Sequence, residues 1–167
     1  MNSMFARTTL TLAPLVAITA TATSARADVI EEPIAMAVLV QKDVAPRMAR
    51  AVTTRVTASE RVTTRDSDAL RASLTAAGID ASTLLDADPT VVASVMRKQR
   101  IEAVMLFSRQ SGGTYQVVTL GPEGTKAGDL STTLTVDSEN FERELDDILL
   151  ATILLTRPQV VLHRKRL

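Results

Sequence analysis

Residues 34–40 (Ile-Ala-Met-Ala-Val-Leu-Val) are apolar at every position, and no other segment constrains the fold of this chain as strongly. A β-strand directs alternate side chains to opposite faces, so a fully apolar strand is typical of a sheet that is covered on both faces. Helices on both sides are the usual covers of such a sheet. The run therefore predicts an α/β (α+β) single domain with this strand inside a mixed sheet of five or six strands.

The remaining pattern predicts the order strand, helix, strand, helix, helix, three strands, helix. The first helix is expected over about 45–58, because Met48, Val52 and Val56 recur on one face. Asp66-Ser67 and Asp88-Pro89 are helix starts, with an aspartate cap in each. The expected strands cover residues 34–40, 60–64, 102–110, 114–120 and 130–136. Gly78 fits the stop of the second helix, and the third helix is expected to end near Gln99.

Two glycine-containing segments separate the last three predicted strands. Ser111-Gly112-Gly113 indicates the tip of a hairpin. Gly121-Pro122-Glu123-Gly124 opens a longer turn, in which Lys126, Gly128 and Asp129 are expected to stay polar. This turn lacks the G-x-x-x-x-G-K-[ST] pattern and no helix follows it, so we interpret it as a hairpin connection rather than a phosphate loop.

The last helix is expected over about 139–156, capped by Asp137-Ser138 and ended by Pro158. Residues 148–155 within it are apolar on nearly every side. That stretch either packs against the sheet or forms an exposed partner-binding face. Residues 159–162 could add an edge strand, and residues 163–167 form a basic tail.

The N-terminal residues 1–27 have the pattern of a secretory signal peptide. Arg7 precedes the apolar stretch 10–22, and Ser24-Ala25-Arg26-Ala27 supplies an A-x-A cleavage site. The alternative is an uncleaved membrane anchor, but the apolar run is short and interrupted by threonines and a proline. Cleavage predicts a bacterial protein of the periplasm or exterior that begins at Asp28, with a leader over 28–33, a domain over 34–162 and no transmembrane segment.

Composition excludes several functions. The chain has no cysteine, so disulfides, thiolate metal sites and lipidation at the cleavage site are excluded. The segment 1–27 carries two of the 19 basic residues and none of the 19 acidic ones, which leaves a mature charge of 17 − 19 = −2. This near-neutral charge makes nucleic acid an unlikely partner, because neutralising phosphate supplies most of that affinity. Only Phe107, Tyr115 and Phe141 are aromatic beyond residue 27, so stacking platforms for bases or sugars are nearly absent.

No catalytic, metal or cofactor site is expected from the residues. His163 is the only histidine, so no second histidine can complete a metal site or a catalytic set. No G-x-S-x-G occurs. The carboxylate pairs Asp86/Asp88 and Asp146/Asp147 are interpreted as caps or solvated residues.

Charge separation offers a candidate partner surface. Its arginines crowd the first helix and second strand: Arg47, Arg50, Arg55, Arg61 and Arg65. A second basic group lies at residues 97–100, and the last helix is strongly acidic. Such separation can steer a charged partner, or the basic and acidic regions can simply face each other within the fold or be solvated.

The carboxyl ends of the first two strands offer a candidate ligand rim. In open α/β sheets ligands bind at that edge, where this chain places Lys42, Asp43, Arg65 and Asp66. Turn and cap chemistry is the alternative role for these residues.

Three segments together resemble the small α/β domain of bacterial envelope proteins. They are the strand and helix over 34–58, Asp88-Pro89 with its helix leading into residues 101–106, and the strand 115–120 with its glycine turn and following strand. This pattern resembles the amino-terminal domain of TolB and relatives of the FlgO and CsgG kind. The resemblance implies a binding or assembly module and supplies no catalytic residue. Unlike in TolB itself, no propeller is expected after the domain.

The leading hypothesis is therefore an exported, non-catalytic envelope module that binds a protein partner. One alternative is a small-ligand-binding or enzyme-like domain that uses the rim, and another is a structural subunit or homo-oligomer that assembles through a sheet edge or the last helix. A deep, closed pocket would favour the ligand hypothesis. An exposed apolar patch within 148–155 would favour partner binding or assembly.

Overall fold

The computed structural model of the chain describes residues 32–157. The predicted signal peptide and its cleavage site, most of the leader, the edge strand at 159–162 and the basic tail lie outside this part.

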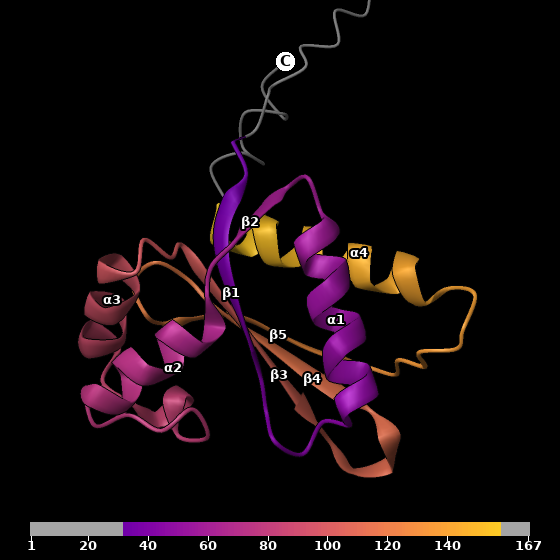
Figure 1. Cartoon of the computed structure of the whole chain (residues 1–167), viewed down its shortest axis with the longest axis horizontal. Coiled ribbons are helices and arrows are strands. Elements are labelled where there is room, and N and C mark those ends of the chain that lie inside the picture. Colours follow the sequence, from indigo (N-terminus) through magenta and orange to yellow (C-terminus); the bar gives the residue numbers. More distant parts are fainter. Residues whose placement is uncertain (1–31, 158–167) are drawn as a thin grey trace, which may run out of the picture. The chain divides into compact units, whose positions relative to one another are not determined.

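A five-stranded mixed sheet forms the centre of the domain, in the order β2-β1-β3-β4-β5 (Figure 1). β1 pairs in parallel with β2 and β3, whereas β3-β4 and β4-β5 are antiparallel. The strands are β1 (Ile34–Val40), β2 (Val62–Thr64), β3 (Ala103–Arg109), β4 (Tyr115–Leu120) and β5 (Lys126–Thr132). The predicted α/β class is confirmed, and β1 has the predicted bounds.

Helices cover both faces of this sheet (Figure 1). α1 (Pro46–Ala58) and α4 (Phe141–Thr156) pack on one face, and α2 (Ser67–Ala76) and α3 (Pro89–Lys98) pack on the other. β1 divides its side chains between the two cores, as a fully apolar strand must. Met36 and Val38 lie in the core under α1 and α4, while Ala37 and Leu39 lie in the core under α2 and α3.

Local capping explains where two of these helices begin. The Asp66 carboxylate accepts hydrogen bonds from the backbone N–H groups of Asp68 and Ala69, and Asp88 accepts one from Thr90. Gly78 follows α2 with φ = 79°, a left-handed conformation that glycine adopts without steric cost. The caps and the stop agree with the sequence pattern. The segment at 80–86 forms only the short 3₁₀ turn η1 (Leu84–Asp86).

The fifth strand lies four residues earlier than predicted. A tight turn, in which Gly121 N–H donates to Thr125 O at 3.0 Å, starts β5 at Lys126. Lys126, Gly128 and Asp129 therefore belong to the strand instead of the turn. The second half of the strand predicted at 130–136 is instead a connection, and Leu134 is buried from it against α1 and α4.

The start of the last helix also differs from the prediction. α4 begins at Phe141 after Asn140, which makes no side-chain capping hydrogen bond. Asp137 is instead paired with Arg47, and the Ser138 hydroxyl accepts from Asn140 N–H at 3.2 Å.

In the described part of the chain, every helix is too short or too polar to cross a membrane.

Candidate functional site

The arginine-rich helix α1 faces the acidic helix α4. Arg47 forms an ion pair with Asp137 at 2.5 Å, just before α4. Arg55 contacts Asp146 through two hydrogen bonds and approaches Glu142 at 3.3 Å. The hydrogen bond from Arg55 lowers the pKa of Asp146, and the same bond raises the pKa of Arg55. The basic and acidic regions therefore partly face each other, and two of the five candidate arginines are engaged within the fold.

The other three candidate arginines stand outside these ion pairs, although Arg61 lies near enough to Asp146 to lower its pKa. Arg50 and Arg61 are exposed and form no ion pair within residues 32–157. Arg65 is also exposed, but its Nε donates to the backbone oxygen of Arg100 at 3.2 Å. Arg65 thus joins the second basic group, whereas Arg47 and Arg55 are paired with the acidic region.

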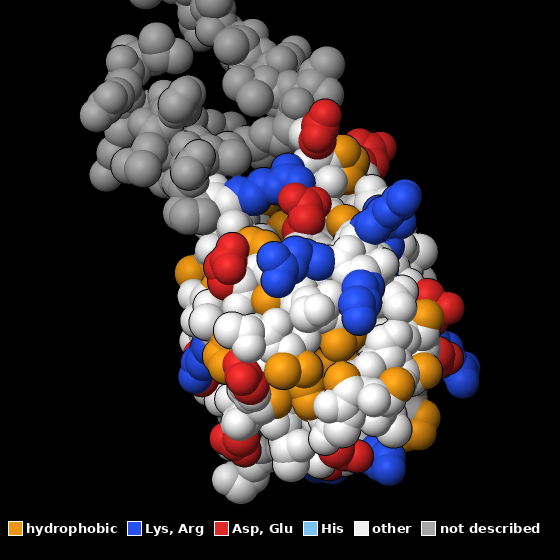
Figure 2. Space-filling view, turned by 90° about the vertical axis from the view of Figure 1, so that its left-hand side faces the viewer, with side chains coloured by type: hydrophobic (Ala, Val, Ile, Leu, Met, Phe, Trp, Pro, Cys, Tyr) orange, Lys and Arg blue, Asp and Glu red, His pale blue; other side chains and the backbone are white. Residues whose placement is uncertain are grey.

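The second basic group lies on the side of the molecule that carries α2 and α3. Arg97 and Lys98 occupy the last turn of α3, and Arg100 follows that helix. Figure 2 shows Lys and Arg side chains gathered toward one end of this side, with apolar patches beyond them. Cations at a helix C-terminus interact favourably with the helix dipole, so part of this charge has a structural role.

The predicted ligand rim is divided by the shortness of β2. This strand has three residues and ends opposite Met36 of β1. Arg65 and Asp66 follow β2 at that level, whereas Lys42 and Asp43 follow the far end of β1. At about 3.3 Å per residue, the two pairs are separated by roughly 15 Å along the strand direction. Asp66 caps the N-terminus of α2, which is the alternative to ligand binding that the sequence offered for this residue.

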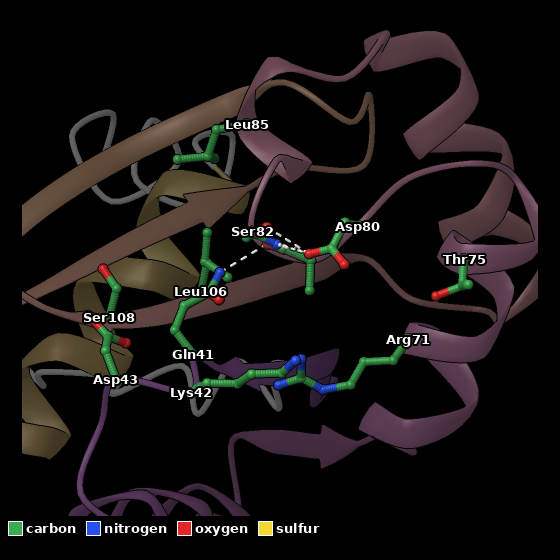
Figure 3. A pocket seen from close by; sticks show the side chains of 11 residues that line it. Gln41, Lys42, Asp43, Arg71, Thr75, Asp80, Ser82, Leu85, Leu106 and Ser108 are labelled. Atoms are coloured by element: carbon green, nitrogen blue, oxygen red, sulfur yellow. Dashed lines mark hydrogen bonds between the residues drawn. The ribbon is translucent and has the colours of Figure 1, made fainter.

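An open depression of about 650 Å³ lies at the carboxyl ends of β1 and β3. We call it the β1–β3 depression (Figure 3). Of the predicted rim it contains Lys42 and Asp43. Its other polar lining residues are Gln41, Arg71, Thr75, Asp80, Ser82 and Ser108.

The short β2 also explains how Arg71 reaches this depression. Beyond Met36, β1 has no strand on its β2 side, and its backbone oxygens need other donors. Ser67 Oγ donates to Val38 O at 2.8 Å, and the Arg71 guanidinium donates to Val40 O. Ser67 and Arg71 are four residues apart on α2, so one helix face replaces the missing strand.

Hydrogen bonds order the opposite wall of the depression. Asp80 Oδ1 accepts from Ser82 N–H at 2.8 Å and from Ser82 Oγ at 2.6 Å. The hydroxyl bond contributes most to lowering the pKa of Asp80, and the nearby charges of Lys42 and Arg71 act in the same direction. Gln41 Nε2 donates to Ala81 O at 2.8 Å, which ties the end of β1 to this loop (Figure 3).

Sequence reasoning missed Arg71, Asp80, Ser82 and Ser108 as lining residues. Ser108 carried a usable signal, because it interrupts the apolar run of β3 near the same sheet edge as Lys42. No comparable signal in the sequence indicated Arg71, because the position of Arg71 depends on how far β2 extends along β1.

The apolar end of α4 presents a different kind of surface. Leu150 and Leu154 are each 40% exposed, and Leu155 is 39% exposed. At about 100° per residue, Leu150 and Leu154 lie 40° apart and roughly opposite the buried stripe that contains Leu145 and Thr152. The helix is therefore apolar on its outer side as well as its inner side.

The edge strand β5 lies beside this end of α4. A Cβ atom built on Gly128 of β5 would overlap the Leu155 side chain, so Leu155 lies directly against the strand. Within residues 32–157, β5 pairs only with β4, which leaves its outer edge without a strand. We call Leu150, Leu154, Leu155 and this outer edge the α4–β5 surface.

The described residues contain no group of three or more His, Cys, Asp or Glu side chains that could hold a metal ion. No family model matches the chain, and no curated protein matches it.

Proposed function

We propose that the protein is an exported, non-catalytic module of the bacterial cell envelope that binds a partner protein through the α4–β5 surface. One observation carries the proposal: the exposed leucines at the end of a helix that also supplies the core. The free edge of β5, with Leu155 against it, fits an extended partner segment that adds a strand through backbone hydrogen bonds. Leu150 and Leu154, on the outer side of α4, offer an apolar contact to another part of the same partner.

Two further observations support this choice of surface. Arg47 and Arg55 are engaged with α4, so the arginines of α1 offer less free charge than the sequence suggests. The β1–β3 depression is open rather than deep and closed, which favours partner binding over the enclosure of a substrate. The resemblance to the TolB amino-terminal, FlgO and CsgG kind of domain implies the same class of function.

Capture from native envelope extract tests the surface. The bait is the wild-type protein, the Leu150→Ser/Leu154→Ser double variant, or a Leu85→Ser variant as a matched control. Leu85 is 45% exposed and lies in η1, away from α4. We expect only the double variant to lose the partner. Capture by the wild-type protein should persist in high salt, because the contact is apolar.

An Arg50→Glu/Arg61→Glu variant provides the opposing arm of the same experiment. If this variant loses the partner while the leucine variant retains it, the arginine surface is the binding site and our assignment is wrong. Capture of a second copy of this chain through the leucines would instead indicate assembly of a homo-oligomer.

Export is a separate part of the proposal and has its own measurement. Mass spectrometry of the protein from its native host should find a mature N-terminus at Asp28. An intact segment 1–27 on a cytoplasmic protein would contradict it.

A further inference from the structure

The β1–β3 depression contains two cations, Lys42 and Arg71, and both lie near enough to Asp80 to lower its pKa. The Lys42 and Arg71 side chains extend toward each other from opposite sides in Figure 3. Neither side chain forms an ion pair within the described residues, and Lys42 makes no hydrogen bond there. Like charges that converge repel each other, and an anion placed between them removes that repulsion.

The donors of these two side chains are mostly unused. An ammonium group has three N–H donors and a guanidinium group has five. One amino group of Arg71 donates a hydrogen bond to Val40 O, and that bond also fixes the direction of the Arg71 side chain. Ser108 adds a hydroxyl from the end of β3.

Each of the two carboxylates in the depression has one oxygen hydrogen-bonded to a neighbouring segment and one oxygen without a hydrogen bond within the described residues. Asp80 accepts from both the N–H and the hydroxyl of Ser82, as described above. Asp43 Oδ2 accepts from Arg109 N–H at 3.1 Å, which joins the segments that follow β1 and β3. The unused N–H donors of Lys42 and Arg71 outnumber the two unbonded carboxylate oxygens, which favours an added acceptor group over a cation.

The place of the depression in the sheet supports the same conclusion. β1 and β3 are parallel neighbours, but the chain after β1 leads to α1, while the chain after β3 forms the hairpin to β4. The crevice between such diverging connections is where open α/β sheets bind ligands. Lys42 lies two residues beyond the end of β1 and Ser108 belongs to β3, so both strands contribute a donor.

We propose that the β1–β3 depression binds the oxyanion group of a small molecule, a carboxylate or a phosphate, between Lys42 and Arg71. Lys42 supplies a mobile charge and Arg71 supplies a guanidinium fixed by β1. This site is separate from the α4–β5 surface, so its test is independent of the test of partner binding.

The test is an NMR titration of the purified protein at constant ionic strength, with chloride as the balancing anion. Inorganic phosphate is added in one arm and malonate in the other. We expect saturable shifts at the amides of Gln41, Lys42, Ser82 and Ser108 in at least one arm. Saturation by one anion alone identifies which group the site prefers.

Three single variants make the assignment specific. Lys42→Met removes the mobile charge and should weaken binding by about fivefold or more. Lys98→Met removes a charge from the end of α3, outside the depression, and should leave binding unchanged. Asp80→Asn removes a negative charge but keeps an oxygen for Ser82, and should tighten binding by about threefold. All three residues are exposed, so thermal melting should show folded proteins.

The proposal is overturned if neither anion gives saturable shifts. It is equally overturned if Lys42→Met and Lys98→Met weaken binding to the same extent, because the response would then be general screening of surface charge. An unchanged or weaker affinity in Asp80→Asn would contradict the balance of charge that we assign to the depression.

Discussion

Gly124 is the residue at which backbone conformation and packing coincide most closely. Its φ of 71° is left-handed, and a Cβ atom there would lie 2.7 Å from Ala93 N and overlap Pro89 O. The β4–β5 turn therefore rests on the first turn of α3. This contact joins the β4–β5 hairpin to the α2–α3 side of the sheet.

Replacing Gly124 with alanine should destabilise the protein by about 2 kcal/mol or more, from backbone strain and steric overlap together. Gly112→Ala is the matched control. Gly112 has a φ of 76° with nothing within 4 Å of its Cβ position, so strain alone should cost about 1 kcal/mol. Urea unfolding measures both variants. Equal losses of stability would show that the Gly124 turn does not press on α3.

Glu102 joins the start of β3 to both ends of the described chain. Its carboxylate accepts from Ala35 N–H at 2.9 Å and pairs with Arg157 at 2.7 Å. Partial burial raises the pKa of Glu102, but the hydrogen bond from Ala35 and the Arg157 contact outweigh this effect and leave the pKa below its ordinary value.

A carboxyl group whose pKa is lower in the folded state contributes stability above its unfolded pKa, and loses it as the pH falls through the folded value. Glu102→Gln should therefore reduce the free energy of unfolding at pH 7 by about 1 kcal/mol or less, because the side chain is partly exposed. The difference between wild type and variant should shrink as the pH falls below the ordinary glutamate pKa of about 4.3, and it should vanish only below the lower pKa of the folded state. Urea unfolding at several pH values tests this, and a difference that grows in acid would contradict it.

Single residues with a local role were predictable, and residues placed by tertiary packing were not. Asp66, Asp88 and Gly78 act within a few residues of their own positions, so the sequence predicts their capping roles. Asp137 also matched a capping pattern, but its carboxylate pairs with Arg47, 90 residues away. A local sequence pattern contains no information about a competing ion-pair partner so far away in the chain.

At the scale of elements, the shortness of β2 has the widest consequences. Its three residues leave Val38 O and Val40 O to side chains of α2, and they separate Arg65 and Asp66 from Lys42. The sequence predicts the existence of this strand, but its extent along β1 depends on pairing. For that reason the candidate rim was predicted as one site, while the structure divides it.

Ser67→Ala should leave Val38 O without its side-chain donor, at a cost of about 1–3 kcal/mol in the free energy of unfolding. Thr54→Ala is a suitable control. Thr54 is exposed on α1, and its hydroxyl makes no hydrogen bond to the described residues, so its loss should change stability by about 0.5 kcal/mol or less. Thermal melting distinguishes the two. Equal stability of both variants would mean that Ser67 does not replace strand pairing.

The strands were predictable to different degrees for a physical reason. β1 is buried on both faces, so its whole composition is apolar and unmistakable. β5 is an edge strand with no fully buried residue, and glycine and charged residues occupy much of it. Its position follows from the tight turn before it, which hydropathy does not encode.

At the scale of the whole molecule, the domain separates into a charged, internally paired region and an apolar surface. Ion pairs join α1 to α4 near the start of α4, while leucines occupy its other end. The sequence predicted that residues 148–155 are apolar all round, but not whether they are buried. The structure answers that question, because Ile148, Leu149 and Thr152 are buried while Leu150 and Leu154 are exposed.

Site-specific photo-crosslinking in the native host tests the central claim most directly. A photoreactive amino acid is placed at position 150, at position 154, or at position 85 as the control. The proposed function predicts one shared partner protein crosslinked from positions 150 and 154, with no such product from position 85. Equal crosslinking from all three positions, or none from positions 150 and 154, would contradict binding through the α4–β5 surface.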